Sequence, residues 1–190
     1  MWKIISLFSA ILIVSDAAKI EDFYGDWYEA GFYPIAVFVP RCSRYSFTPA
    51  ENQCSCDDGS SNSFYMSSTI GNTTKTYVNL VPVVLVDSPK EVMPAFDVKC
   101  RCGDKKFTDH PVARLVNGDY FFLYHTLFQN TYNSTEIEPN GAFLFSRKIE
   151  SENTLAKALI SNEDLKKREG AFLCTKEYIE ENNIDPKTII

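Results

Sequence analysis

The feature that most constrains this fold is a series of short segments in which apolar and polar residues alternate, each ending at Gly, Pro, Asn or Asp. Such alternation is typical of β-strands with one buried face. Turn sequences such as Asn117-Gly118-Asp119 join neighbouring segments directly, so we expect a meander of about eight antiparallel strands. The predicted strands span residues 27–33, 42–48, 53–57 with an extension into 64–70, 75–86, 95–102, 112–116, 120–128 and 142–149.

The periodicity changes after the last predicted strand. Beyond a capping residue at Ser151 or Asn153, Leu155, Ala158 and Leu159 recur at helical spacing. Strands followed by a single helix exclude the parallel α/β classes, in which the two alternate. Eight tilted strands can close into a barrel with room for one small ligand. We therefore expect an all-β fold, an eight-stranded antiparallel up-and-down barrel with a C-terminal α-helix packed on it.

The first seventeen residues have the pattern of a secretory signal peptide. Lys3 precedes an apolar run over residues 4–14, and the small residues at 15–17 suit cleavage beside Ala17 or Ala18. The alternative, a membrane anchor, is disfavoured because a run of roughly eleven residues cannot span about 30 Å of hydrocarbon. The expectation is one secreted, extracellular domain over residues 18–190, without a transmembrane segment.

Charge and composition narrow the function classes. The net charge is −6, the sequence pI is about 5.0, and no Lys/Arg block stands out, which argues against a nucleic-acid or anionic-membrane surface. Aromatic residues make up 14% of the chain. Such a content fits a cavity lined with rings, and it fits an aromatic-rich β core equally well.

Six cysteines lie after the predicted leader: Cys42, Cys54, Cys56, Cys100, Cys102 and Cys174. An even number in an oxidising compartment predicts disulfides, up to three of them. A thiolate metal site is the alternative, and reduced thiolates do not suit an extracellular protein, so we expect no metal. Sequons at Asn72 and Asn133 predict N-glycosylation on exposed loops.

Four sequence segments stand out in this order: YGDWYEAGFYP, RCSRYSFTP, NGDYFFLYHT and AFLFSRKIE. Together they resemble the lipocalin family, in particular the insect bilin-binding protein, insecticyanin and apolipoprotein D branch. The helix and a late cysteine follow in the family's order, so the resemblance covers the domain, although residues 49–103 match poorly and are about ten residues longer than expected.

The resemblance assigns Gly25, Trp27 and Arg147 to closure of the barrel floor. The glycine would permit a tight turn, the indole would plug the floor, and the guanidinium would lie over the indole as a cation–π contact worth about 0.5–2 kcal/mol. The other reading of Arg147 is an ordinary exposed arginine at a strand end.

Strand alternation then sorts side chains between the interior and the outside. If Trp27 points inward, so do Glu29, Gly31 and Tyr33. For residues 120–128 both faces are apolar, and a slip of one residue would exchange them. The predicted lumen residues, candidates for ligand binding, are Glu29, Tyr33, Tyr45, Phe47, Phe121, Leu123, His125, Phe143 and Phe145.

Two of these residues are ionisable, and a loop completes the predicted site. A lone buried carboxylate is costly, so Glu29 should have a hydrogen-bond partner. His125 is either satisfied by a neighbouring tyrosine or contacts a ligand carboxylate or carbonyl. By the resemblance, residues 34–41 cover the mouth, and the side chains of Ile35, Val37 and Phe38 there form a hydrophobic lid or a membrane or partner contact.

The resemblance also implies a disulfide between Cys42 and Cys174. The remaining four cysteines form two C-x-C motifs, for which we expect two cross-links, with the pairing of Cys54 and Cys56 to Cys100 and Cys102 open. If these cross-links face the lumen, they narrow it.

Motifs for catalysis are missing from the sequence, including Gly-x-Ser-x-Gly, His-Glu-x-x-His and a phosphate loop, and it has two histidines. We therefore predict a carrier and not an enzyme, without a required cofactor, that binds a bilin, retinoid, sterol or fatty acid in its lumen. The alternative is a ligand-poor lipocalin that acts through its surface or mouth loops as a protein-binding or inhibitor module. A protein partner or a homo-oligomer is compatible with the sequence.

Overall fold

The computed structural model of the chain describes residues 17–33, 42–51, 53–69, 76–87, 99–108, 111–125, 141–159 and 170–189. Several predictions fall outside these ranges: the leader up to residue 16, the mouth-loop residues Ile35, Val37 and Phe38, and the sequon residues Asn72 and Asn133.

The described chain is mostly β-structure with two short α-helices. The elements in order are η1 (Ile20–Phe23), β1 (Gly25–Tyr33), β2 (Arg44–Pro49), β3 (Cys54–Cys56), β4 (Ser63–Thr69), β5 (Thr76–Pro82), β6 (Val84–Leu85), β7 (Cys100–Cys102), β8 (Lys105–Phe107), β9 (Val112–Asn117), β10 (Tyr120–His125), β11 (Gly141–Ser146), α1 (Glu152–Leu159), β12 (Ala171–Phe172), α2 (Lys176–Glu181) and η3 (Pro186–Thr188).

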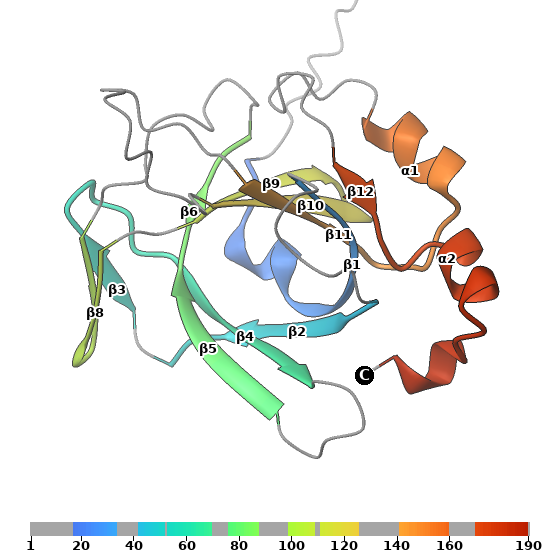
Figure 1. Cartoon of the computed structure of the whole chain (residues 1–190). Helices are drawn as coiled ribbons and strands as arrows, with labels where there is room; N and C mark the ends of the chain where they lie inside the picture. Colours follow the sequence, from blue (N-terminus) through green and yellow to red (C-terminus); the bar gives the residue numbers. More distant parts are fainter. Residues whose placement is uncertain are drawn as a thin grey trace, which may run out of the picture.

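The main sheet has nine strands, eight of them in the order β5-β4-β2-β1-β11-β10-β9-β6 (Figure 1). Strand β12 pairs with the second half of β1. The predicted hairpin at Asn117 to Asp119 joins β9 to β10. The two edge strands of this order, β5 and β6, are consecutive in the chain and separated only by Val83. The sheet must therefore curl so that its two edges lie close to each other.

This topology corrects the predicted ring of eight antiparallel strands in three ways, all within the described residues. The predicted strand 75–86 is interrupted at Val83, and its end, β6, runs parallel to β9. The predicted strand 53–57 does not extend into 64–70, because a turn over residues 57–59 separates β3 from β4. Strand β3 belongs to a separate three-stranded sheet with β7 and β8, and β8 was not predicted.

Apolar side chains on the two faces of the main sheet form two cores. The inner cluster consists of Phe23, Trp27, Phe47, Phe64, Val83, Ala113, Phe121, Leu123 and Phe145, all buried. These residues come from strands at both ends of the sheet order, and only a curled sheet can bring them together. The outer cluster consists of Ala30, Val112, Tyr120, Phe122, Tyr124, Ala142, Leu144 and Leu155. Because Leu155 belongs to α1, the helix packs on the outside of the sheet.

The three-stranded sheet β3-β7-β8, called the stapled sheet below, holds two disulfides. The register pairs Cys54 with Cys102 and Cys56 with Cys100, and both pairs are bonded, with Cα–Cα distances of 4.1 Å. The four cysteines pack with Leu80, beside the partly buried Tyr65. Tyr65 of β4 lies directly opposite Leu80 of β5. Their neighbours in the chain are Phe64, a member of the inner cluster, and Val81, which packs against that cluster. Tyr65 and Leu80 therefore lie on the outer face, and these disulfides do not narrow the interior.

The C-terminal segment is fixed to the sheet by a third disulfide, between Cys42 and Cys174, with a Cα–Cα distance of 4.5 Å. Cys174 packs with Ile179 of α2 and Ile189, beside Tyr28 of β1. In Figure 1, α1 and α2 lie on one side of the molecule and the stapled sheet lies on the other.

Candidate functional site

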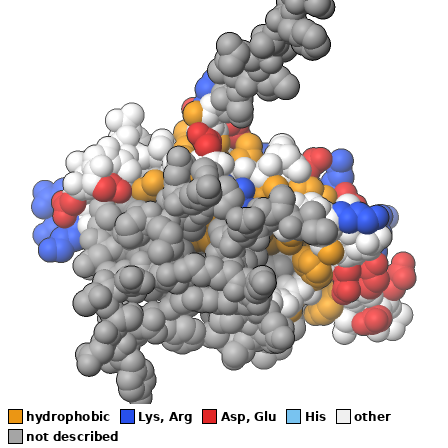
Figure 2. Space-filling view, turned by 90° about the horizontal axis from the view of Figure 1, so that it is seen from above, with side chains coloured by type: hydrophobic (Ala, Val, Ile, Leu, Met, Phe, Trp, Pro, Cys, Tyr) orange, Lys and Arg blue, Asp and Glu red, His pale blue; other side chains and the backbone are white. Residues whose placement is uncertain are grey.

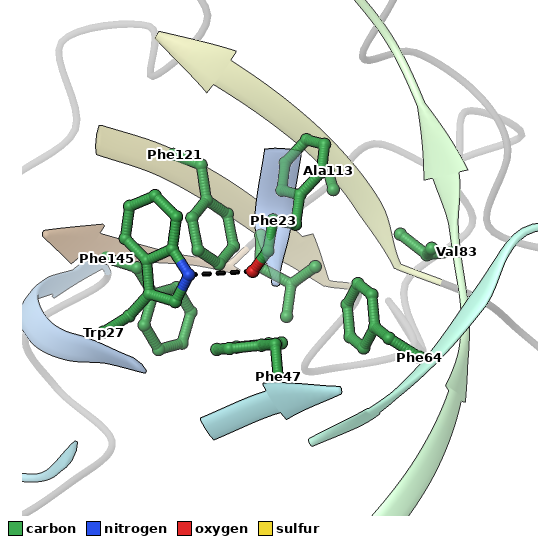
Figure 3. Packing of buried hydrophobic residues seen from close by; sticks show 9 residues of the cluster. Phe23, Trp27, Phe47, Phe64, Val83, Ala113, Phe121 and Phe145 are labelled. Atoms are coloured by element: carbon green, nitrogen blue, oxygen red, sulfur yellow. Dashed lines mark hydrogen bonds between the residues drawn. The ribbon is translucent and has the colours of Figure 1, made fainter. Parts of the chain in front are cut away.

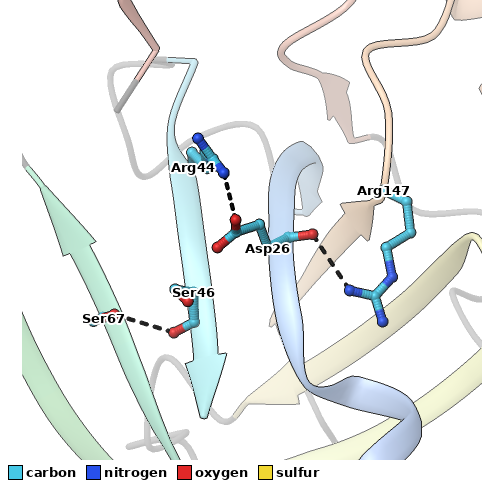
Figure 4. Close-up of polar contacts among 5 residues, drawn as sticks. All are labelled: Asp26, Arg44, Ser46, Ser67 and Arg147. Carbon is cyan, nitrogen blue, oxygen red and sulfur yellow. Dashed lines mark hydrogen bonds and ion pairs between the residues drawn. The ribbon is translucent and has the colours of Figure 1, made fainter.

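The floor of the interior is closed by Trp27 and Arg147, which lie 120 residues apart in the chain. Trp27 is fully buried, and the guanidinium carbon of Arg147 lies 3.5 Å from the centre of its ring. The indole Nε1 donates a hydrogen bond to the Phe23 carbonyl at 2.8 Å. Arg147 donates to the carbonyl oxygens of Asp22 at 3.1 Å and Asp26 at 3.4 Å, and Figure 4 shows the second of these bonds. One guanidinium thus covers the indole and fastens η1 to β1.

The glycine of the Gly-x-Trp motif is required by this contact. Gly25 has a φ of +100°, which L side chains rarely adopt. A Cβ atom built on it would lie 2.9 Å from Nη1 of Arg147. Any larger residue would therefore strain the backbone and push the guanidinium away from the indole.

Above the indole, aromatic rings fill the lower part of the interior (Figure 3). Phe121 makes edge-to-face contacts with Phe23, Trp27 and Phe47 at centroid distances of 5.2, 4.6 and 5.4 Å, and it stacks on Phe145 at 4.7 Å. Each such pair adds about 0.5–1.5 kcal/mol beyond the burial of apolar area. This part of the interior is therefore a rigid aromatic floor.

Two of the rings in this floor are not among the predicted lumen residues. Phe23 lies in η1, four residues before Trp27, and Phe64 in β4 contacts Phe47 at 5.0 Å. Phe64 falls in a predicted strand, but without a known neighbour its face could not be chosen.

Glu29 lies two residues after Trp27 on β1. Its carboxyl group forms a hydrogen bond with the side chain of Tyr45, which lies on the neighbouring strand β2. Burial raises the pKa of Glu29 to about 7, and the hydrogen bond from Tyr45 lowers it in part. Burial and the Glu29 charge hold the pKa of Tyr45 well above its usual range. The Tyr45 ring also meets Phe145 edge to face at 5.5 Å. An ionisable pair thus lies directly over the aromatic floor.

His125 and Phe143 lie further up the same wall. Their rings are 5.4 Å apart at 81°, an edge-to-face contact. The register of β10 on β11 places Phe143 beside Leu123 and His125 beside Gly141. Burial lowers the pKa of His125 to about 4, so the imidazole is neutral at pH 7. A neutral imidazole can donate one hydrogen bond and accept another.

A β-bulge corrects the predicted alternation of β1. The register shifts between Glu29 and Gly31, so Gly31 pairs with Leu144 of the outer cluster and Phe32 pairs with Phe143 on the inner face. In the same register Tyr33 pairs with Ala142, and the predicted inward position of its side chain lies outside what the structure describes. Sequence alternation could not reveal the bulge, because one extra residue leaves no mark in the pattern.

The other predicted lumen residues lie on the inner face. Phe47, Phe121, Leu123 and Phe145 are members of the inner cluster, and Tyr45 and Phe143 pack against it. The residues that alternate with them on β10, Tyr120, Phe122 and Tyr124, belong to the outer cluster. Of the two alternatives for β10, the structure therefore has Phe121 and Leu123 inside.

No protein family model and no curated protein matches the chain. Among solved structures it is similar to lobster apocrustacyanin A1, with 13% identity over 80% of this chain and 77% of that chain and a TM-score of 0.42. It is also similar to apocrustacyanin C2, with 14% identity over 81% and 78% and a TM-score of 0.43.

The described residues offer neither a metal-ligand cluster nor a membrane-spanning helix. Within the ranges given above, no group of three His, Cys, Asp or Glu side chains could hold a metal ion. The helices of those same ranges include none that is long and apolar enough to cross a membrane.

Proposed function

We propose that this chain is a secreted lipocalin that carries one small hydrophobic or amphipathic molecule in the interior of its sheet. The observation that carries the proposal is the sealed aromatic floor, in which Arg147 caps Trp27, with the Glu29–Tyr45 pair directly above it. Apolar walls with a few fixed polar groups are what small-molecule sites have in common. The three disulfides suit an oxidising compartment.

The ligand class follows from the walls. Rings bind flat or elongated apolar molecules, so bilins, retinoids, sterols and fatty acids are the candidates. Burying about 400 Å² of such a ligand gains on the order of 10 kcal/mol before ordering costs. A carboxylate ligand beside Glu29 would be repelled once Glu29 ionises. Ligands that present an O–H or N–H group to Glu29 are therefore favoured over fatty-acid anions at pH 7 and above.

The polar groups of the interior serve binding better than catalysis. Glu29 is held by Tyr45, and His125 is neutral and packs against Phe143. General acid–base chemistry needs a donor and an acceptor aimed at one reacting group. We therefore propose a carrier and not an enzyme, without a required cofactor.

A second candidate function has its own observation in support. The floor rings pack against one another, and the stapled sheet stands outside the main sheet. In this reading the lipocalin acts through its surface as a protein-binding or inhibitor module and leaves its interior empty of ligand.

Ligand titration separates the two candidates. If the leader is removed, Trp27 is the only tryptophan, because the other is Trp2. Retinol, biliverdin and a sterol would be titrated into residues 18–190 while Trp27 fluorescence is followed. The carrier proposal expects saturable one-to-one quenching by at least one of them, weakened in Tyr45→Phe and unchanged in Tyr65→Phe, its control on the outer face. No response to any of them would favour the surface-acting module.

A further inference from the structure

The outward face of the stapled sheet carries a cluster of cations that the function above does not use. Lys99, Arg101 and Lys106 lie on this face and are exposed. A fourth exposed cation, Lys105, pairs with Cys102 and therefore lies on the cysteine face. These cations do not form a continuous basic block in the sequence, because cysteines and the Gly103-Asp104 turn separate them. In Figure 2, Lys and Arg side chains gather at the left edge, the side on which β3 and β8 lie in Figure 1.

The register concentrates these charges. Arg101 pairs directly with Lys106 on β8 and with Ser55 on β3. Lys99 lies two residues before Arg101, about 7 Å away on the same face. Like charges directly opposite each other destabilise a sheet. Within the part of the chain that the structure describes, none of the four cations forms an ion pair with a carboxylate.

The cations line a hollow and do not simply cover a flat face. A surface pocket of about 290 Å³ is bordered by Ser55, Asp57, Lys99, Cys100, Arg101, Lys106, Phe107 and Thr108. That volume is close to the lower end of small-molecule sites. Two disulfides on the opposite face hold the strands in register. A ligand would therefore meet a site that is already ordered, which lowers the entropy cost of binding.

We infer that this pocket binds a sulfated glycan. The fork of Arg101 and the ammonium groups of Lys99 and Lys106 suit sulfate esters, which stay charged at every physiological pH. Sugar hydroxyls would find an acceptor in Asp57 and partners in the hydroxyls of Ser55 and Thr108. Asp57 repels the anionic groups of any of these partners, but sugar hydroxyls can donate hydrogen bonds to its carboxylate, whereas the ionised side chains of an acidic peptide and the phosphates of a membrane can only accept. The net charge of −6 makes the patch the local exception on an acidic protein.

The test uses residues 18–190 and heparin as the probe, with binding measured at physiological and raised salt. The inference predicts binding that weakens as salt rises, and a loss of about tenfold or more in the double variant Arg101→Ser/Lys106→Ser. The control is Lys157→Ser/Lys176→Ser, which removes the same charge from exposed positions on α1 and α2 and should keep heparin affinity. An unchanged Trp27 emission spectrum and an unchanged urea unfolding midpoint in both variants show that the fold is intact. This control needs no interior ligand, so the glycan inference and the carrier function can fail independently.

Three outcomes would overturn the inference: no heparin binding at physiological salt, equal losses in the two double variants, or equally tight binding of poly-glutamate or of phosphatidylserine vesicles. Asp57→Asn adds a readout that local charge alone does not predict. A sulfated sugar that uses the carboxylate as an acceptor binds no more tightly to this variant, whereas a purely electrostatic partner binds more tightly because a repulsive charge is gone.

Discussion

At the scale of single residues, the floor depends on a few atoms that have no substitutes. Gly25 leaves the space that Nη1 of Arg147 occupies, and Arg147 in turn covers the indole of Trp27. An exposed ion pair alone would contribute little to stability. The Arg147 guanidinium in addition donates hydrogen bonds to two backbone carbonyls that are more than 120 residues away in the sequence. Two substitutions separate these contributions.

Removing the guanidinium should destabilise the fold. Arg147→Ala loses the cation–π contact and two hydrogen bonds, so we expect the free energy of unfolding to fall by about 2 kcal/mol. Urea unfolding followed by Trp27 fluorescence would measure it. The control is Arg44→Ala, which breaks the exposed ion pair with Asp26 and should cost less than about 1 kcal/mol. Equal losses in the two variants would mean that Arg147 is an ordinary surface arginine.

A methyl group at Gly25 should have a similar effect for a steric reason. Gly25→Ala places a Cβ 2.9 Å from Nη1 of Arg147 at a φ of +100°, and we expect a loss of about 1–2 kcal/mol. Gly118→Ala is the matched control because nothing lies within 4 Å of its Cβ position. Thermal unfolding of both variants checks the prediction, and a Gly25 variant as stable as the Gly118 variant contradicts it.

Glu29 should make stability depend on pH. Burial raises the pKa of Glu29 from its ordinary value of 4.5 to about 7 in the folded chain, so the folded state binds the proton more tightly than the unfolded state does. The stability that Glu29 contributes is therefore complete below pH 4.5 and is lost as pH rises to 7, by about 3 kcal/mol. His125 acts in the opposite direction, because its pKa of about 4 makes stability rise with pH between 4 and 6.5.

The comparison with Glu29→Gln isolates the first effect from the second. The free energy of unfolding of the variant minus that of the native chain should increase as pH rises from 4.5 to 7 and stay level above it. Denaturant titrations at a series of pH values would measure this difference. A difference that does not change with pH would show that Glu29 is ionised and solvated.

At the scale of elements, the two disulfides of the stapled sheet are nested, so their contributions are not additive. Cys54–Cys102 and Cys56–Cys100 close loops of 48 and 44 residues, but once one is formed the other closes only a short ring. By loop-closure entropy the first contributes about 4 kcal/mol and the second about 2 kcal/mol.

Variants with one or both bridges removed test this nesting. Replacing either pair with Ala should cost about 2 kcal/mol, and replacing both should cost about 6 kcal/mol. Urea unfolding of the three variants gives the values. If each single removal costs as much as half of the double removal, the bridges act independently and the nested account is wrong.

How far sequence alone could go differs between elements. The strands with clear alternation and the β9–β10 hairpin were predictable, because period and turn residues are local signals. The bulge at Glu29 and Gly31, the break at Val83 and the parallel pairing of β6 with β9 were not, because each is fixed by partners distant in sequence. The predicted burial of Glu29 indicated that its carboxyl needs a hydrogen-bond partner. The register of β1 against β2 was needed to identify that partner as Tyr45.

At the scale of the whole molecule, the described surfaces divide between three tasks. The inner cluster seals one end of the interior, the outer cluster holds α1, and the stapled sheet presents cations away from both. Because the stapled sheet packs on the outer face near Leu80 and not in the interior, the proposed glycan site and the proposed ligand site can operate separately.

Native mass spectrometry of the protein from its own source tests the carrier function most directly. If the interior carries a ligand, the spectrum will show the chain together with one small apolar molecule, which is released on unfolding. A spectrum of the chain alone, from a protein that also fails to bind retinol, biliverdin and sterol, would contradict the account.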